Sequence, residues 1–371
     1  MISYSLQRFW KYLLPIIKLT PRPVLKFIIE KFVKLQRQEL IGELPSRIIL
    51  FVTKKCNLRC RHCFYNRDSA LEMSLQQIQQ IALTNFKQII FTGGEPFMRD
   101  DFSDIVLSFK NCEVINIDTN GTLTKKIEVF LDKILKETKF KLVIQVSLDG
   151  SPLIHNHIRN IEGSFKKTLQ TIYILSQYKK MYPSRFNNII VSTSINRLNY
   201  KHLGELIKYI EPLDVTHLFN FTRSAKLHTF NISRERLSGF DVLEDIVLNI
   251  NEMVQVFKYL DTKLWKKNTD LLPIMNRQIM KEVIKILEQK SSPPCLAGQT
   301  EVVIYPEGDV GICEMLKPVG NLKETNYDFE RFYKQHKEFK IKKSCTCIHD
   351  CNVMSQIKFS PKSLIEIVSN L

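Results

Sequence analysis

Six short apolar runs rich in β-branched residues alternate with helical patterns through the first two thirds of the chain. The runs are residues 47–53, 88–96, 114–121, 142–150, 188–196 and 215–222. Helical spacing between them is clearest over Ser74–Asn85, where Ser74 is a candidate N-cap, and over Thr124–Lys136. Strands separated by helical crossovers predict an α/β fold, a parallel sheet or partial (β/α)6 TIM-like barrel with right-handed connections.

The polar motifs of this region each lie at the carboxyl end of a predicted strand or directly after it. They are the cysteines of 56–63, Gly93–Gly94–Glu95–Pro96, Asp118–Thr119–Asn120–Gly121 and Ser147–Leu148–Asp149–Gly150. In parallel α/β folds the carboxyl ends of the strands and the loops after them build the site. The sequence therefore predicts one site assembled from several strand ends.

The remaining segments differ from this core. Near the N-terminus, apolar residues recur at helical spacing among lysines, at Leu25, Ile28, Ile29, Phe32 and Leu35. This basic amphipathic helix is expected to dock on the protein's own body, with a peripheral membrane surface as the alternative. Composition predicts four parts: a helical extension (1–44), the core (45–285), a small cysteine-rich domain (290–355) and a tail (356–371).

Charge and targeting signals narrow the class of protein. The chain has 371 residues and a formal net charge of +16, which suits an acidic partner but is equally explained by a solvated basic surface. The N-terminus lacks the apolar core and cleavage site of a signal peptide. No stretch approaches the ~20 apolar residues of a spanning helix. We therefore expect a cytoplasmic protein.

The nine cysteines fall into groups, which favours metal ligation in a reducing compartment over a disulfide framework. Cys56, Cys60 and Cys63 have the spacing C-x3-C-x2-C, and no fourth cysteine follows nearby. A structural zinc site is normally closed by four ligands. Three thiolates that hold an iron–sulfur cluster leave one metal position open, which indicates a site that binds a further ligand.

Together with "FTGGEP" at 91–96, this cysteine motif resembles that of the radical SAM superfamily. The resemblance covers about residues 47–225. It implies a 4Fe–4S cluster whose open iron binds S-adenosylmethionine (SAM), and reductive cleavage of SAM to a 5′-deoxyadenosyl radical that abstracts a substrate hydrogen. It also implies SAM contacts for Gly93, Gly94, Glu95, Pro96, Ser147, Arg159 and His62, and an electron donor such as a flavodoxin or ferredoxin.

A second cysteine group follows the core. Cys295 and Cys313 flank a predicted hairpin with its turn at 307–309, and Cys345, Cys347 and Cys351 come after it. Alone, this pattern also fits a zinc ribbon. After a radical SAM core it resembles the auxiliary-cluster domain of SPASM and twitch proteins, which implies a second 4Fe–4S cluster. Five cysteines suit one such cluster, with Cys295 and Cys313 as ligands and the choice among the other three open.

The substrate is not fixed by these motifs. The resemblance leaves an unspecified radical modification, with peptide maturation and oxidation of a small molecule such as a sugar alcohol as its two forms. A basic, zinc-binding nucleic-acid module is the alternative from a different class. That alternative does not account for GGEP or for the placement of every motif at a strand end, so we do not expect a nucleic-acid partner.

Overall fold

The computed structural model divides into two compact units. The larger comprises residues 45–249 and 301–341, and the smaller comprises 1–44, 250–300 and 342–371. The structure describes residues 22–39, 44–63, 71–223, 245–265, 270–289, 295–340 and 348–369. Both units are discontinuous in sequence, and the four-part division expected from composition stays a prediction.

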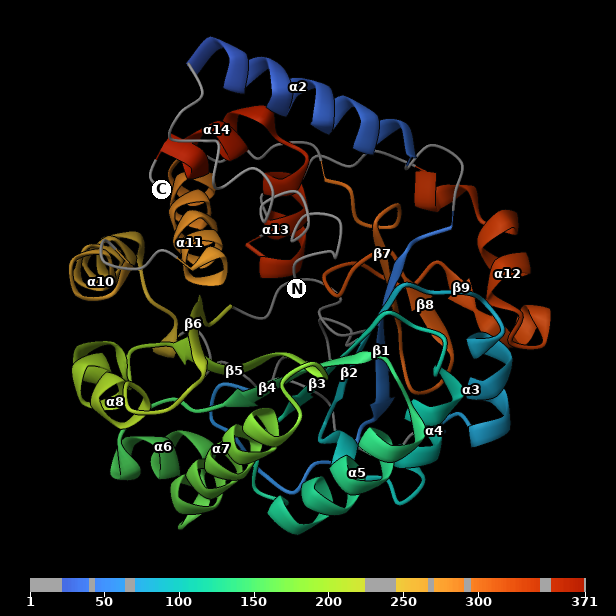
Figure 1. Ribbon diagram of the computed structural model, residues 1–371, viewed down its shortest axis with the longest axis horizontal. Helices are drawn as coiled ribbons and strands as arrows, with labels where there is room; N and C mark the ends of the chain where they lie inside the picture. The colour runs from blue at the N-terminus through green and yellow to red at the C-terminus, as the bar shows by residue number, and fades with distance from the viewer. Residues whose placement is uncertain are drawn as a thin grey trace. The chain divides into compact units, whose positions relative to one another are not determined.

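The six predicted strands are present in the larger unit and pair in parallel (Figure 1). They are β1 (Arg47–Thr53), β2 (Gln88–Gly93), β3 (Val114–Thr119), β4 (Lys141–Ser147), β5 (Phe186–Ile195) and β6 (Thr216–Phe221). They follow one another in the sheet in chain order. The predicted partial barrel of parallel strands is confirmed.

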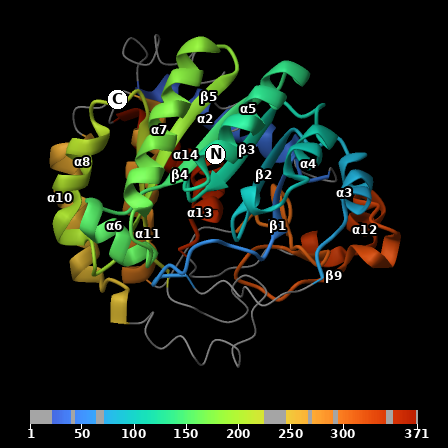
Figure 2. The ribbon, with the colours of Figure 1, turned by 90° about the horizontal axis from the view of Figure 1, so that it is seen from below.

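Helices follow each of the first five strands (Figure 2). They are α3 (Leu75–Ala82), α4 (Phe102–Ser108), α5 (Thr124–Glu137), α6 (Pro152–Arg159), α7 (Ser164–Met181) and α8 (Leu203–Ile210), with short 3-10 turns at Pro96–Met98 and Tyr200–His202. The predicted N-cap is confirmed, because Ser74 forms a capping box with Gln77. The predicted helix after the third strand is also present, as α5.

The sheet is buried, as a parallel sheet with helical crossovers requires. Every residue of β1 is buried, so its uninterrupted apolar sequence reflects cover on both faces. Between the sheet and its helices, Phe97 packs edge-on against Phe102 and Phe130, with ring centroids 5.1 and 5.3 Å apart. This packing holds the strand ends, and hence the loops that follow them, in fixed positions.

The predicted hairpin of the cysteine-rich region is confirmed, and it extends the core sheet. Its strands are β7 (Glu301–Ile304) and β8 (Asp309–Gly311), followed by β9 (Gly320–Asn321). β7 lies parallel to β1, and Arg47 and Glu301 form a buried ion pair between them. The segment continues through η6 (Leu322–Thr325), α12 (Phe329–Gln335) and η7 (Lys337–Lys340).

The smaller unit is helical. Its described helices are α2 (Arg22–Glu39), α10 (Ile250–Lys263), α11 (Leu271–Gln289), α13 (Asp350–Lys358) and α14 (Pro361–Ser369). α2 contacts α14, and Leu25, Ile29 and Val33 on one side of α2 are buried. The favoured expectation, that the apolar face of this helix docks on the protein itself, is confirmed. Among the described helices, none has both the length and the apolar character to cross a membrane.

Candidate cofactor site

A cavity of about 320 Å³ opens at the carboxyl ends of the strands in the larger unit. Every strand from β2 to β6 contributes to its wall, and the loop after β1 contributes its three cysteines. The site expected from the placement of the motifs is therefore at the predicted edge of the sheet. Gly93, Gly94, Ser147 and Arg159, assigned as SAM contacts from the sequence, also line it.

The cysteine loop is fixed on the end of α6. The backbone N–H of Arg61 donates to Ile158 O at 2.8 Å, and its Nε donates to His157 O at 3.0 Å. The first bond gives a partner to Ile158 O, one of the last carbonyls of the helix, and the second adds to the bond that His157 O accepts from Asn160 N. The loop brings Cys56, Cys60 and Cys63 to one cavity wall. Across the described ranges, no three His, Cys, Asp or Glu side chains stand in a ready metal-binding arrangement.

The GGEP loop packs directly on the start of the cysteine loop. Gly94 N donates to Thr53 O, and Glu95 N donates to Lys55 O, both at 2.8 Å. A Cβ at position 94 would lie 2.1 Å from Lys55 O, and Gly93 has a φ of +132°. Only glycine permits this approach and this backbone conformation. The two glycines therefore set the distance between the GGEP and cysteine loops.

Glu95 and Pro96 are buried and are not among the residues that line the cavity. The Glu95 carboxylate accepts hydrogen bonds from Asn120 N at 2.7 Å and Thr119 Oγ1 at 2.8 Å. Burial raises the pKa of Glu95 to about 7, although these hydrogen bonds oppose the shift. Glu95 thus joins the loop after β2 to the turn after β3, and the backbone of its loop, through Gly93 and Gly94, faces the cavity.

The turn after β3 is also hydrogen-bonded to the cysteine loop. Asn120 Nδ2 donates to Asn57 Oδ1 at 2.9 Å, and Asn57 Nδ2 donates to Thr122 Oγ1 at 2.8 Å. Asn120 also accepts from Thr168 Oγ1 through its carbonyl, at 2.9 Å. The loops after the first three strands therefore form one hydrogen-bonded assembly. Asp118, in the last residues of β3, lines the cavity, and burial raises its pKa to about 7.

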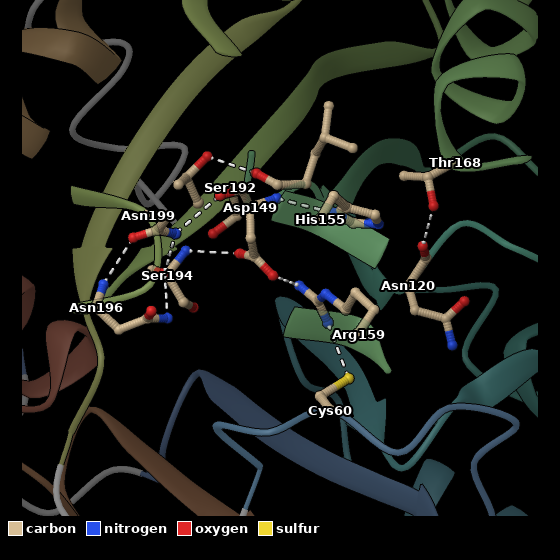
Figure 3. A network of polar contacts seen from close by, with 12 residues as sticks. Cys60, Asn120, Asp149, His155, Arg159, Thr168, Ser192, Ser194, Asn196 and Asn199 are labelled. Carbon is tan, nitrogen blue, oxygen red and sulfur yellow. Dashed lines mark hydrogen bonds and ion pairs between the residues drawn. The ribbon is translucent and has the colours of Figure 1, made fainter. Parts of the chain in front are cut away.

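Arg159 lies between an acidic residue and a cysteine of the motif (Figure 3). Its Nη2 forms an ion pair with Asp149 Oδ2 at 2.7 Å, and its Nη1 lies 3.6 Å from Cys60 Sγ. Burial alone would raise the pKa of Asp149, but the charge of Arg159, together with smaller contributions that include the hydrogen bond from Ser194 N, holds the pKa below its usual range. Burial raises the pKa of Cys60, and the same guanidinium opposes that shift.

His62 and Ser147 also face the cavity, as expected. Burial lowers the pKa of His62 to about 4, so its ring is neutral, and its Nδ1 is buried without a hydrogen-bond partner. Gln145, two residues before Ser147 on β4, lines the cavity with its Oε1 likewise unpartnered. Such atoms require a ligand or water to satisfy them.

Several polar residues of the cavity were not predicted as site residues, among them Gln145, Ser192, Ser194, Asn220 and Arg223. Strand register brings the serines and amides together, since Ser147 pairs with Ser192 and Ser194 with Asn220. The alternation of polar residues along 188–196 was the available signal, because alternate residues of a strand share one face. The ion pair of Arg223 with Glu314, at 3.1 Å, had no local signal.

The second cysteine group is described only in part. Cys295 and Cys313 are both buried, in the smaller and the larger unit respectively. Cys351 is partly exposed, and Cys345 and Cys347 lie outside the described residues. The ligand set of the expected auxiliary cluster therefore stays a prediction.

The sequence of this region matches a known family. The model of the radical SAM superfamily matches residues 50–210, which include the cysteine motif, the GGEP loop and Arg159. The chain carries a radical SAM domain. Radical SAM domains bind a 4Fe–4S cluster and SAM, and the family resemblance and both of these expected cofactors are confirmed at the level of the family.

Two curated relatives extend the match beyond the domain. The chain is 25% identical over 304 residues to the antilisterial bacteriocin subtilosin biosynthesis protein AlbA of Bacillus subtilis, covering 77% of this chain and 59% of AlbA. It is 32% identical over 198 residues to a cysteine-type anaerobic sulfatase-maturating enzyme of Clostridium novyi, covering 47% of this chain and 50% of that enzyme. The chain thus spans about half to three fifths of these relatives.

Solved structures share the fold. SuiB of Streptococcus suis, bound to its precursor peptide SuiA, aligns with a TM-score of 0.54 at 13% identity, over 80% of this chain and 67% of SuiB. The native enzyme anSMEcpe, with bound AdoMet and a peptide, aligns with a TM-score of 0.52 at 19% identity, over 88% of this chain and 98% of that one. At these identities the likeness establishes the fold.

The lining of the cavity fits the two groups of this family. Cys56, Cys60 and Cys63 all line the cavity, and three thiols are the number that a cluster with one open metal position needs. Arg159 supplies a cation for a carboxylate, and the glycine loop presents backbone to the same space. The unpartnered Gln145 Oε1 and His62 Nδ1 are polar atoms that a bound cofactor would satisfy.

Proposed function

We propose that the protein is a radical SAM enzyme that abstracts a hydrogen atom from a peptide substrate. One observation carries the first part: Cys56, Cys60 and Cys63 share a single cavity with Gly93, Gly94 and Arg159. A zinc knuckle beside an unrelated glycine turn does not require this convergence.

The cofactors would supply the radical chemistry, and the residues of the cavity would bind and position them. When bound, the cluster supplies the electron for reductive cleavage of SAM, which yields methionine and the 5′-deoxyadenosyl radical. Cys56, Cys60 and Cys63 hold the cluster. The backbone of Gly93 and Gly94 would bind the SAM amino group, and the guanidinium of Arg159 would bind the SAM carboxylate. The chain positions the reactants and excludes water from them.

We favour a peptide over a small-molecule alcohol because of the relatives. AlbA is named for bacteriocin biosynthesis, another relative for maturation of the sporulation killing factor, and SuiB was solved with a precursor peptide. The cavity suits polar substrate groups, since Gln145, Asn220 and Arg223 line it. Peptide amides supply both donors and acceptors for such side chains.

We further propose a second 4Fe–4S cluster held by Cys295, Cys313 and two of Cys345, Cys347 and Cys351. A cluster with a full set of ligands suits electron transfer, since no open position remains for a substrate. Such a cluster would supply an electron-transfer centre. An external flavodoxin or ferredoxin would reduce the first cluster, and the protein would act in the cytoplasm.

Metal analysis tests the enzyme class. Anaerobically purified protein should contain iron and acid-labile sulfide, and zinc without sulfide would instead support a zinc-binding module. The substrate class is tested by co-expression with short peptides encoded beside the gene, followed by mass spectrometry. The proposal predicts a peptide altered by wild-type enzyme and unaltered by Cys56→Ala. If no such peptide changes while SAM is still cleaved, the peptide assignment is wrong.

A further inference from the structure

Asp149 is fixed in place from several sides at the end of β4 (Figure 3). It is fully buried, and its Oδ1 accepts from Ser194 N at 3.1 Å. Its own N–H donates to His155 Nδ1 at 3.1 Å, and its carbonyl accepts from Asn199 Nδ2 at 2.8 Å. Burial lowers the pKa of His155 to about 3, so a neutral ring accepts this bond. The carboxylate therefore has little freedom to move.

This fixed carboxylate faces Arg159, the last residue of α6. The ion pair between them is 2.7 Å long, and both side chains are buried, at 0% and 8% exposed. An isolated charge at this depth would be costly, so each group requires the other. The pair links the loop after β4 to the end of α6, which also carries the cysteine loop through Arg61.

The guanidinium still has unused donors. An arginine has five N–H groups in a rigid planar fork. Nη2 forms the ion pair with Asp149, and Nη1 lies 3.6 Å from Cys60 Sγ. Nε is buried without a hydrogen-bond partner. Since Arg159 lines the cavity, it retains the capacity to bind an anion there.

We propose that Asp149 is a positioning residue for the cofactor. Its carboxylate orders the Arg159 guanidinium beside Cys60 before SAM binds, so that the SAM carboxylate meets a donor group that is already in place next to the cluster. An arginine left to order itself on binding would lose side-chain entropy at that step, which weakens binding. This inference rests on the proposed function, because it assumes that SAM occupies the cavity.

Anaerobic calorimetry of SAM binding to the reconstituted enzyme tests the proposal, with Asp149→Asn, Arg159→Gln and the double variant. We expect Asp149→Asn to raise the SAM dissociation constant about tenfold, the usual effect of weakening one charge-assisted hydrogen bond. Because Asp149 acts through Arg159, the double variant should bind no more weakly than Arg159→Gln alone. The change that SAM causes in the EPR spectrum of the reduced cluster should require correspondingly more SAM.

Asp101→Asn is the matched control. It removes the carboxylate from another arginine pair of the same unit, Arg99–Asp101 at 2.7 Å, which does not line the cavity. This variant should bind SAM as wild type does. Unchanged affinity in Asp149→Asn, or losses that add in the double variant, would overturn the proposal. Failure of wild type to bind SAM would instead refute the proposed function.

If Asp149→Asn does not fold, SAM binding is measured on Arg159→Lys instead. A lysine ammonium keeps the charge and the ion pair but lacks the planar fork that spans Asp149, Cys60 and the cavity. We expect SAM binding about tenfold weaker, with the iron content unchanged. Wild-type affinity in Arg159→Lys would show that an ordered guanidinium is not required.

Discussion

The carboxylate of Glu95 accepts a hydrogen bond from the backbone N–H of Asn120 at 2.7 Å, which ties the GGEP loop to the turn after β3. Asn120 reaches the cysteine loop through Asn57. Glu95 is therefore a brace between loops, and its buried carboxylate holds in position the backbone that lines the cavity.

Glu95→Ala should weaken SAM binding while the cluster remains. Removal of the carboxylate leaves the N–H of Asn120 and the hydroxyl of Thr119 without their acceptor, at a cost of about 1–3 kcal/mol per buried group. The GGEP loop should shift, and we expect a SAM dissociation constant about tenfold higher by calorimetry. Iron content should match wild type, since no cysteine is altered. An unchanged SAM affinity would show that the Glu95 carboxylate is not needed to position the GGEP loop.

Glu95 should also make stability depend on pH. The pKa of Glu95 is about 7 in the folded protein, against an ordinary value of 4.5, so the folded state favours the protonated form. The contribution of Glu95 to the free energy of unfolding is therefore fully present below pH 4.5 and is lost as the pH rises through 7. The loss is on the order of 3 kcal/mol. Comparing urea denaturation of wild type and Glu95→Gln between pH 5 and 8 should show wild type losing more stability, and parallel curves would refute this.

Gly94→Ala should impair SAM binding more than its small volume suggests. The new Cβ would lie 2.1 Å from the backbone oxygen of Lys55, so the GGEP and cysteine loops must separate. We expect at least about a tenfold loss of SAM affinity. Gly163→Ala is the control, because a Cβ at Gly163 would meet nothing within 4 Å, so the variant adds a methyl group without a clash. A Gly94→Ala enzyme that binds SAM as Gly163→Ala does would show that the close approach is dispensable.

Much of the fold and part of the site could be predicted from local patterns in the sequence. β1 to β6 could be predicted because each is a short apolar run, and the segments between them show the helical spacing of apolar residues. Cys56, Cys60 and Cys63 belong to one short segment, so their convergence is nearly a local property. The parallel pairing of β7 with β1 joins segments more than two hundred residues apart and left no trace in either pattern.

The same limit explains the polar groups that were missed. Asp149 belongs to a motif at a predicted strand end and Arg159 was an expected SAM contact, but their pairing depends on how α6 returns to the end of β4. Arg223 and Glu314 meet only because the hairpin that carries β8 joins the core sheet. Glu95 was expected to contact SAM as part of the GGEP motif, which stays a prediction, and the bonds of its carboxylate to Thr119 and Asn120 were not predicted.

The second cluster is tested by its iron. Two 4Fe–4S clusters correspond to about eight irons per chain. Cys313→Ala should remove about half of them and leave SAM cleavage measurable, because the first cluster is held by other cysteines. Cys112→Ala is the matched control, since Cys112 is also buried and no cluster is assigned to it. Equal iron in Cys313→Ala and Cys112→Ala would eliminate Cys313 as a ligand.

Formation of 5′-deoxyadenosine shows directly whether this cavity binds and cleaves SAM. Reconstituted enzyme is incubated anaerobically with SAM and dithionite, and the product is quantified by liquid chromatography and mass spectrometry. The account predicts 5′-deoxyadenosine from wild type and Cys112→Ala and none above background from Cys56→Ala, Cys60→Ala or Cys63→Ala. Absence of the product from iron-replete wild type, or its continued formation by Cys56→Ala, would contradict the assignment of this cavity.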